Sequence, residues 1–218
     1  MTRVDQVYDR RFDVRARERK LAAWAEIAAY LHRFVLPDKP VLDLGCDEGY
    51  FIRNVVASER WATDVRDMRA SLPDDVRFVE SDGLLLRSAI PIGHFGTVFM
   101  SNYLEHLRSA NDVVEQLHVA FELLTPGGRV IVLQPNIRLT GGAYWDFIDH
   151  HVALTERSLV EAAELAGLRT VKLITRFLPY TTKGKLPVDP RLVRLYLAVP
   201  LVWRFLGQQT LYVGERLG

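Results

Sequence analysis

Short apolar runs, each about the length of a β-strand, dominate the first two thirds of the chain. They lie at residues 41–45, 60–64, 76–80, 95–101 and 129–134. Several lack strict alternation of apolar and polar positions, a pattern typical of strands buried on both faces. Helical spacing of apolar residues appears between some of them, at 51–59 and 109–124. This order predicts an α/β fold in which helices cover both faces of a parallel sheet.

Helical and extended segments continue towards both ends of the chain. Residues 16–36 place apolar side chains at i, i+3 and i+4 spacing, which predicts a helix with one apolar face. Another helix is expected to end at Gly167, with Thr155 and Ser158 as candidate residues to cap its beginning. Strands are expected near 169–176 and 210–216, which brings the predicted sheet to seven strands.

Residues 190–206 predict a strongly apolar helix that is interrupted by Pro200 and carries Arg191, Arg194 and Arg204. The segment is too short and too charged to span a bilayer. Two interpretations stay open. In the first, the helix packs on the sheet and lies between the sixth and seventh strands along the chain. In the second, it lies at a membrane interface or covers a bound substrate.

Length and composition indicate one globular domain over residues 1–218, because the chain is long enough for one sizeable core and short for two. The 28 basic and 27 acidic side chains leave a net charge of +1, so no nucleic-acid partner is expected. The N-terminal residues are too charged for a secretory signal, and no uncharged run reaches the roughly 18 residues that cross a bilayer. A cytoplasmic protein is expected.

The stretch 41–51, VLDLGCDEGYF, is typical of a buried strand that runs into a glycine-marked turn. A dinucleotide-binding loop would have glycine at positions 45, 47 and 50, but Asp47 and Tyr50 stand at the last two. The acidic Asp47 would lie near an anionic pyrophosphate, which disfavours NAD. The single cysteine, Cys46, excludes an internal disulfide, and no Cys/His cluster has structural zinc spacing.

Four further segments accompany this turn: ATD at 62–64, SDG at 81–83, FGTVFMSNYLEHL at 95–107 and LTPGGRVIVLQPN at 124–136. Together they resemble the motifs of class I S-adenosylmethionine (SAM)-dependent methyltransferases. The resemblance implies a Rossmann-like, doubly wound sheet of seven strands, mostly parallel with an antiparallel last strand. It also implies SAM as the cofactor.

The resemblance implies roles for individual residues around the turn. Asp64, about 20 residues after the turn, would accept hydrogen bonds from both ribose hydroxyls. Asp82 would lie beside the adenine, and Asp43 would organise the loop or reach the methionine ammonium through water. The residues expected to bind SAM are Tyr8, Asp43, Gly45, Cys46, Asp47, Gly49, Asp64, Val65, Ser81, Asp82, Gly83, Ser101 and Asn102.

Asp47 departs from the family pattern, which has glycine at this position. Aspartate tolerates a left-handed backbone better than most residues, at about 1 kcal/mol of strain. Its charge would either repel the methionine carboxylate of SAM or pair with the α-ammonium. Because the methionine end is a zwitterion, we expect the loop still to bind SAM.

Three histidines are candidates for a general base that deprotonates an acceptor. His106 follows the fourth strand at the mouth of the sheet, although a histidine that packs at the start of the next helix is an alternative. His150 and His151 end the segment YWDFIDHH. In the same segment, Tyr144, Trp145 and Asp146 are expected to contact the acceptor. The alternative is a lid helix that uses its aromatic residues as core.

The expected function is transfer of a methyl group from SAM to an oxygen, or less favourably a nitrogen, of a small metabolite or sugar. SNYLEHL, LQPNIR, YWDFIDHH and RFLPYTT resemble segments of bacterial methyltransferase-like proteins associated with glycan or secondary-metabolite assembly. Two alternatives stay open: a SAM-binding enzyme with a non-methylating reaction, and a catalytically silent partner or scaffold.

Three segments are expected to lie outside the common fold. Residues 1–36 would form an N-terminal helical cover, and residues 137–160 and 177–208 would form additions on the acceptor side. The motif of metal-dependent catechol methylation and the NPPY motif of base or glutamine methylation are both missing from the sequence. We therefore expect no metal.

Overall fold

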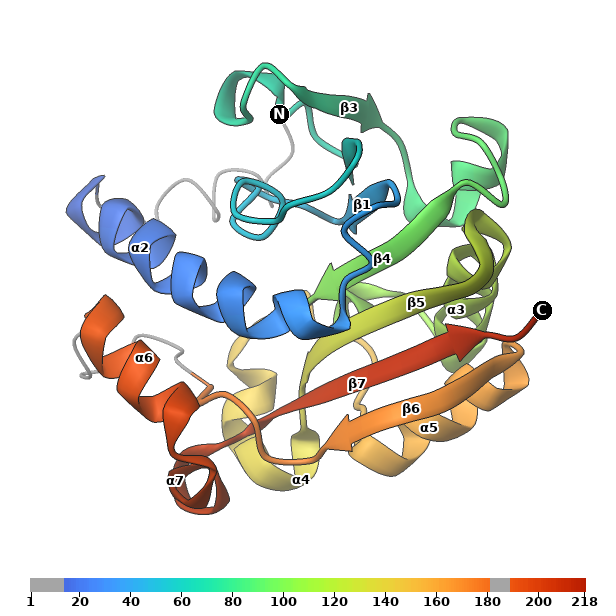
Figure 1. Ribbon diagram of the computed structural model, residues 1–218. Helices are drawn as coiled ribbons and strands as arrows, with labels where there is room; N and C mark the ends of the chain where they lie inside the picture. Colours follow the sequence, from blue (N-terminus) through green and yellow to red (C-terminus); the bar gives the residue numbers. More distant parts are fainter. Residues whose placement is uncertain (1–13, 181–188) are drawn as a thin grey trace.

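The computed structural model describes residues 14–180 and 189–218, with side chains described from residue 18 onwards. A seven-stranded sheet in the order β3-β2-β1-β4-β5-β7-β6 forms its centre (Figure 1). The strands are β1 (Val41–Leu44), β2 (Arg60–Asp64), β3 (Val76–Glu80), β4 (Phe95–Ser101), β5 (Leu124–Pro135), β6 (Leu168–Ile174) and β7 (Gln209–Arg216). Only β7 runs antiparallel to its neighbours, which confirms the predicted fold class.

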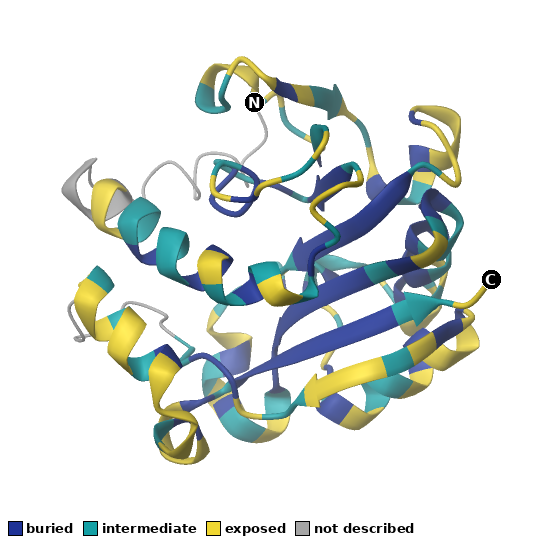
Figure 2. Cartoon of the chain, in the orientation of Figure 1, coloured by how far each residue is buried: buried dark blue, intermediate teal, exposed yellow. Residues whose placement is uncertain are grey.

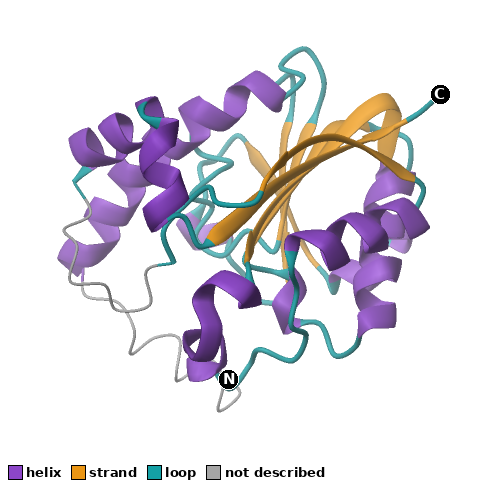
Figure 3. Ribbon diagram, turned by 90° about the horizontal axis from the view of Figure 1, so that it is seen from below, coloured by secondary structure: helices purple, strands orange, loops and turns teal. Residues whose placement is uncertain are grey.

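Helices cover both faces of the sheet (Figure 3). One face carries α2 (Val14–Leu31), α6 (Pro190–Ala198) and α7 (Pro200–Leu206). The other carries α3 (Ala110–Leu123) and α5 (Glu156–Leu165). The shorter helices are η1 (His32–Phe34), η2 (Arg69–Ser71), η3 (Gly83–Ser88), η4 (Leu104–His106), α4 (Ile137–Thr140) and η5 (Gly141–Asp146). Among the described residues, no helix is long and apolar enough to cross a membrane.

The central strands are buried on both faces, which explains why their sequences show little alternation (Figure 2). In β5, Val130 and Val132 pack into the core beneath α3 and α5. Ile131 and Leu133 point the other way, into the core beneath α2, α6 and α7. Successive side chains therefore serve two separate cores, and both must be apolar.

The prediction of a helix at 51–59 is wrong. Residues 47–54 form a series of turns, and no α-helix lies between β1 and β2. One helical hydrogen bond forms, from Arg53 N–H to Gly49 O at 3.1 Å. The guanidinium of Arg60 then donates to the carbonyls of Ile52 and Arg53, at 3.1 and 3.2 Å. An extending helix would need these carbonyls for its own N–H groups, so the side chain of Arg60 ends it.

The sheet order reverses between β1 and β4, because the chain moves outward to β2 and β3 and then returns to the other side of β1. In open α/β sheets, ligands bind beyond the carboxyl ends of the strands at this point. The loops after β1 and β4 both open at this edge, and they carry several of the predicted cofactor residues and the candidate base His106.

The N-terminus of α5 is held by a capping box, as the sequence predicts. The Thr155 side chain accepts from the Ser158 N–H at 3.2 Å, and the Ser158 hydroxyl accepts from the Thr155 N–H at 2.9 Å. These bonds satisfy two N–H groups that have no partner inside the helix. The cap lies shortly after the segment with His150 and His151.

We predict that Thr155→Ala lowers the free energy of unfolding by about 1 kcal/mol, the usual effect of losing an N-cap side chain. Chemical denaturation monitored by circular dichroism measures the change. Ser88→Ala, at an exposed serine at the end of η3, is the control and should stay within about 0.5 kcal/mol of the parent protein. Equal stability of the Thr155 variant and the control would contradict the role of the cap.

Candidate functional site

The predicted cofactor residues gather at one edge of the sheet, after the ends of β1, β2, β3 and β4. The turn after β1 is bonded to the end of β2, because the N–H groups of Gly45 and Cys46 both donate to Thr63 O at 2.9 Å. The segment after β3 is bonded to β2 in the same way, through Ser81 N–H and Asp64 O at 3.0 Å. Of the predicted residues, Tyr8 lies outside the described part of the chain.

Asp64 is the central side chain of this edge. It is buried, and its Oδ2 accepts the backbone N–H of Asp47 at 3.0 Å. Its Oδ1 accepts the backbone N–H and the Nε of Arg66, at 3.0 and 3.3 Å. A carboxylate offers about four acceptor sites, so capacity remains for a ligand hydroxyl. The side chain thus joins the turn after β1 to the loop after β2.

Asp47 adopts the left-handed backbone that its position requires, with φ of 48° between Gly45 at 69° and Gly49 at 68°. Its carboxylate accepts from the guanidinium of Arg66 at 3.0 Å and lies 4.0 Å from Lys20 Nζ. The side chains of Arg66 and Lys20 therefore both face the carboxylate of Asp47, the residue that departs from the family pattern. Lys20 belongs to α2, so this ion pair also connects the helix to the turn.

Burial sets the protonation of two further groups beneath the turn. It raises the pKa of Asp43 well above its usual range, and the nearby charges of Asp64 and Asp47 raise it further, whereas the Ile52 N–H donates to Asp43 at 3.3 Å and opposes the shift. Burial also raises the pKa of the Cys46 thiol. Cys46 stays protonated at neutral pH, so its role in the turn is that of a small buried side chain.

Tyr103 and Gln116 belong to this edge, and the sequence analysis missed them. The Tyr103 ring packs against Gly45, and its hydroxyl reaches Gly83, so a side chain at either glycine would collide with it. The hydroxyl donates to Gln116 Oε1 at 2.8 Å, and Gln116 Nε2 donates to Gly83 O at 3.3 Å. One feature of the sequence could have indicated Gln116, because it is a polar residue on the apolar face of the predicted helix at 109–124.

The other predicted positions at this edge differ in exposure. Val65, directly after Asp64, is 65% exposed, and an apolar side chain exposed at this place offers a surface for a ligand ring. Asp82 is exposed and caps η3 by accepting the Leu84 N–H at 3.0 Å. Asn102, after β4, is exposed and has a left-handed φ of 48°.

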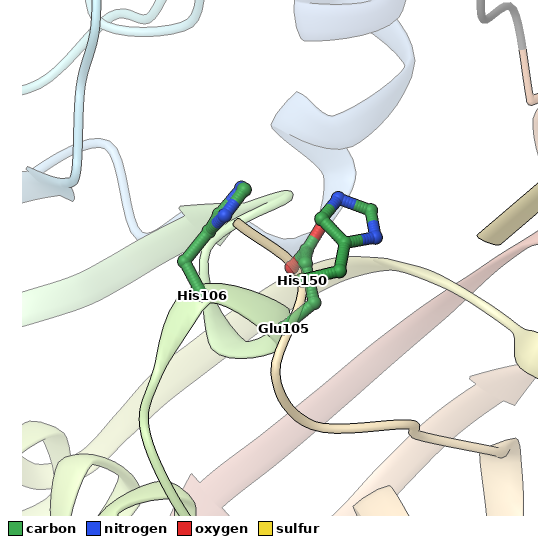
Figure 4. A group of neighbouring side chains, drawn as sticks. All are labelled: Glu105, His106 and His150. Atoms are coloured by element: carbon green, nitrogen blue, oxygen red, sulfur yellow. The ribbon is translucent and has the colours of Figure 1, made fainter. Parts of the chain in front are cut away.

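On the acceptor side, the structure brings His106 and His150 together with Glu105, a residue that the sequence analysis missed (Figure 4). The imidazole rings of His106 and His150 have centroids 5.0 Å apart and are nearly perpendicular. His106 lies in η4, immediately after β4, whereas His150 comes from the segment that follows η5. The sequence signal for Glu105 is an acidic residue placed between the apolar Leu104 and His106.

Glu105 is fully buried, and burial raises the pKa of its carboxyl group. Its backbone carbonyl accepts the N–H groups of His151 and Val152, at 2.8 and 3.2 Å. The His151 residue itself is exposed, so the structure separates this candidate base from the other two. Its role stays a prediction.

Of the three predicted acceptor contacts, Tyr144 is fully buried, and its hydroxyl donates to the carbonyl of Val152. Its ring lies against His150, with centroids 4.9 Å apart. This placement favours the alternative interpretation of Tyr144 as a core residue that supports His150. Trp145 is 52% exposed and Asp146 is exposed, so both remain accessible to a ligand.

Comparison with known proteins agrees with the predicted fold and with SAM as the cofactor. A family described as a methyltransferase domain matches residues 15–173. A SAM-dependent methyltransferase from Archaeoglobus fulgidus is 17% identical, with a TM-score of 0.64 over 87% of this chain and 92% of that one. The geranyl diphosphate C-methyltransferase of Streptomyces coelicolor is 14% identical, with a TM-score of 0.59 over 88% of this chain and 78% of that one.

A third similar structure is that of the cyclase SpnF, which is 16% identical with a TM-score of 0.61 over 89% of this chain and 81% of that one. No curated protein sequence matches the chain. At these identities, the structural likeness shows the shared fold and says nothing of the acceptor.

The fold and the cofactor edge define a class I methyltransferase that uses SAM. The chain belongs to the methyltransferase-domain family, whose match spans more than two thirds of its length.

We predict that Asp64→Asn raises the dissociation constant of SAM about 10- to 100-fold, because hydrogen bonds to a charged group each contribute about 1.5–3 kcal/mol. Isothermal titration calorimetry measures the change. Asp67→Asn is the matched control, since Asp67 is exposed and pairs only with Arg69 among the described residues, and its effect should be below about twofold. Unchanged affinity in the Asp64 variant would exclude this carboxylate from the cofactor site.

Proposed function

We propose that the chain transfers the methyl group of SAM to a hydroxyl oxygen of a small metabolite or sugar, with nitrogen as a less favoured acceptor. The pairing of His106 and His150 carries the proposal, because these imidazoles lie just past β4, on the same edge as the cofactor residues. A hydroxyl must lose its proton during methylation, and a neutral imidazole can accept it.

The residues at the cofactor edge fit SAM by their charge and shape. We infer that Asp64 binds the ribose hydroxyls, that Asp82 lies beside the adenine, and that exposed Val65 contacts its ring. The carboxyl groups of Asp47 and Asp64 lie together above the buried Asp43, and this acidic pair suits a cofactor with a sulfonium and an ammonium group. Arg66 and Lys20 offset part of this acidity, so the methionine carboxylate is not repelled by Asp47.

When bound, SAM supplies an activated methyl group, so the protein has mainly to align the acceptor and to accept a proton. The tautomer of His106 follows from one hydrogen bond. Its Nδ1 lies 2.9 Å from the carbonyl of Asp149, which can only accept, so Nδ1 carries the hydrogen and the lone pair of the neutral ring lies on Nε2. We infer that the segment at 137–160, which holds Trp145 and His150, forms part of the acceptor site.

A non-methylating reaction is the second candidate, since a cyclase is among the proteins that share this fold. A catalytically silent partner protein is the third. Incubation of the purified chain with SAM and a pool of hydroxylated metabolites and sugars separates the three. S-adenosylhomocysteine together with a methylated product supports the proposal. SAM binding with breakdown to methylthioadenosine, or with a product that gains no methyl group, supports the second candidate, and the absence of SAM binding leaves the third.

The outer faces of α6 and α7 also bear on the partners of this chain. Leu192, Leu195, Leu201 and Phe205 are each more than half exposed there. Arg191 and Arg204 are exposed on the same two helices, whereas Arg194 is paired with Glu26 at 2.6 Å. Exposed apolar side chains flanked by arginine suit a membrane surface that contains anionic lipid. We propose peripheral contact with such a surface.

We predict that His106→Gln and His150→Gln each lower kcat for S-adenosylhomocysteine formation by about 100-fold, the usual contribution of a general base. Calorimetry should show unchanged SAM affinity in both variants. His118→Gln, at a half-exposed histidine of α3, is the matched control and should keep kcat within about twofold. A loss confined to His151→Gln would contradict the pairing of His106 and His150.

For the membrane surface, we predict that Leu201→Glu together with Phe205→Glu abolishes co-sedimentation with phosphatidylserine vesicles. The wild-type chain should bind these vesicles better than neutral phosphatidylcholine vesicles, because arginine contributes about 1 kcal/mol near an anionic surface. Ile92→Glu is the control, since Ile92 is 65% exposed on the segment that precedes β4. Equal sedimentation of wild type and double variant would refute the contact.

A further inference from the structure

Three side chains from two separate segments converge beyond the end of β4. They are Glu105, His106 and His150, and one carboxylate or ring nitrogen atom of each lies within 4.8 Å of the others. Figure 4 shows Glu105 and His106 projecting from η4 while His150 approaches from the neighbouring segment. A carboxylate and two imidazoles at this separation form a set of potential metal ligands.

The carboxylate of Glu105 is the unusual member of this group. It is fully buried, and among the described residues no hydrogen bond of standard geometry reaches either of its oxygens, although the side chain of Gln134 lies close enough to lower the carboxyl pKa somewhat against the larger effect of burial. Burial raises the pKa of this carboxyl group and so favours its neutral form, because an ionised carboxylate buried without a partner is strongly unfavourable. A cation in direct contact with the carboxylate would remove this penalty. The two histidines lie close enough to bind the same cation.

His106 is oriented as a metal-binding histidine usually is. Its Nδ1 donates to the backbone carbonyl of Asp149 at 2.9 Å, and the Asp149 carboxylate lies 3.6 Å from the same nitrogen. This hydrogen bond directs the lone pair to Nε2 and holds the ring plane. Backbone contacts of this kind to the other ring nitrogen recur around histidine ligands of bound metals.

The two segments are also fixed relative to each other. The Glu105 carbonyl accepts from His151 N–H at 2.8 Å and from Val152 N–H at 3.2 Å. The His150 ring is stacked on Phe147, with centroids 5.0 Å apart, and its edge meets the buried ring of Tyr144. The side chains are therefore held in place by backbone bonds and aromatic packing, which is the support that a binding site needs.

We propose that Glu105, His106 and His150 bind one divalent transition-metal ion of the zinc type and leave at least one coordination position open. Two imidazoles and one carboxylate form the ligand set of catalytic zinc sites, whereas Mg²⁺ prefers oxygen ligands alone. Bonds of about 2.1 Å in a tetrahedron separate the ligand atoms by about 3.4 Å, so the three groups would move inward by about 1 Å.

The role of the ion rests on the function proposed above. A divalent cation lowers the pKa of a hydroxyl in its open position, so the acceptor ionises near neutral pH. The O–H bond breaks, and its proton passes to solvent. The oxygen forms the new C–O bond as the methyl–sulfur bond breaks and its electron pair stays on sulfur. The sulfonium becomes a neutral thioether, and the released proton balances the charge. When the ion is bound, it takes over deprotonation of the acceptor from His106 and His150, which act as the base only in the metal-free protein.

The test uses the full chain, stripped of metal, without SAM or acceptor. Co²⁺ is the first probe, because its visible absorption reports the ligands, and Zn²⁺ follows in competition. We expect one ion per chain, with binding weakened at least 100-fold by Glu105→Gln, His106→Gln or His150→Gln. Mg²⁺ at the same concentration should not displace Co²⁺. Thermal melts of each variant without metal check that it folds, and wild type should gain thermal stability from Zn²⁺ whereas these three variants should not.

His118→Gln is the control for surface binding, because His118 and Glu122 form a half-exposed pair 3.9 Å apart on α3. It should bind Co²⁺ as wild type does. The proposal is overturned if wild type binds neither probe, if binding survives in folded Glu105, His106 and His150 variants, or if His118→Gln removes it. In contrast, metal binding without any methylated product would refute only the proposed function, and methylation that persists after chelation would refute only the role of the ion.

Discussion

The carboxylate of Asp64 is the constraint on which the cofactor edge depends. It accepts the Asp47 N–H and two N–H groups of Arg66, and Arg66 in turn donates to the side chain of Asp47. The turn has left-handed backbone at Gly45, Asp47 and Gly49, and only Asp47 is strained by it, because glycine adopts positive φ without steric cost. The hydrogen bonds around Asp64 offset this strain and hold the turn against the end of β2.

Two polar clusters share one edge of the sheet and differ in character. The acidic pair of Asp47 and Asp64 lies at the ends of β1 and β2, above the buried Asp43, and it suits a cationic cofactor. The cluster of Glu105, His106 and His150 follows β4, and it suits a proton, a cation or an acceptor hydroxyl. Tyr103 lies in the chain between them and packs on the glycine of the first turn. Through this side chain, the position of one cluster depends on that of the other.

Much of the fold was predictable because burial on both faces leaves a strong local pattern. The bounds of β2, β3 and β4 agree with the apolar runs, and α5 begins at its predicted cap Thr155. The segment after β1 shows the limit of such reasoning. Its apolar spacing is helical, yet the side chain of Arg60, from the next strand, takes the carbonyls that a helix would use.

For the site, the order of residues along the chain predicted roles for the glycine turn, Asp64 and the three histidines, because short motifs record what a loop needs locally. It said nothing about which distant groups would meet. Glu105 and His150 are separated by α3, β5, α4 and η5, and Tyr103 and Gln116 lie in different segments. These pairings arise when the strands assemble and the helices pack on the sheet. The burial and hydrogen bonding that fix them act between distant segments, so the sequence of either segment alone shows no pattern that predicts them.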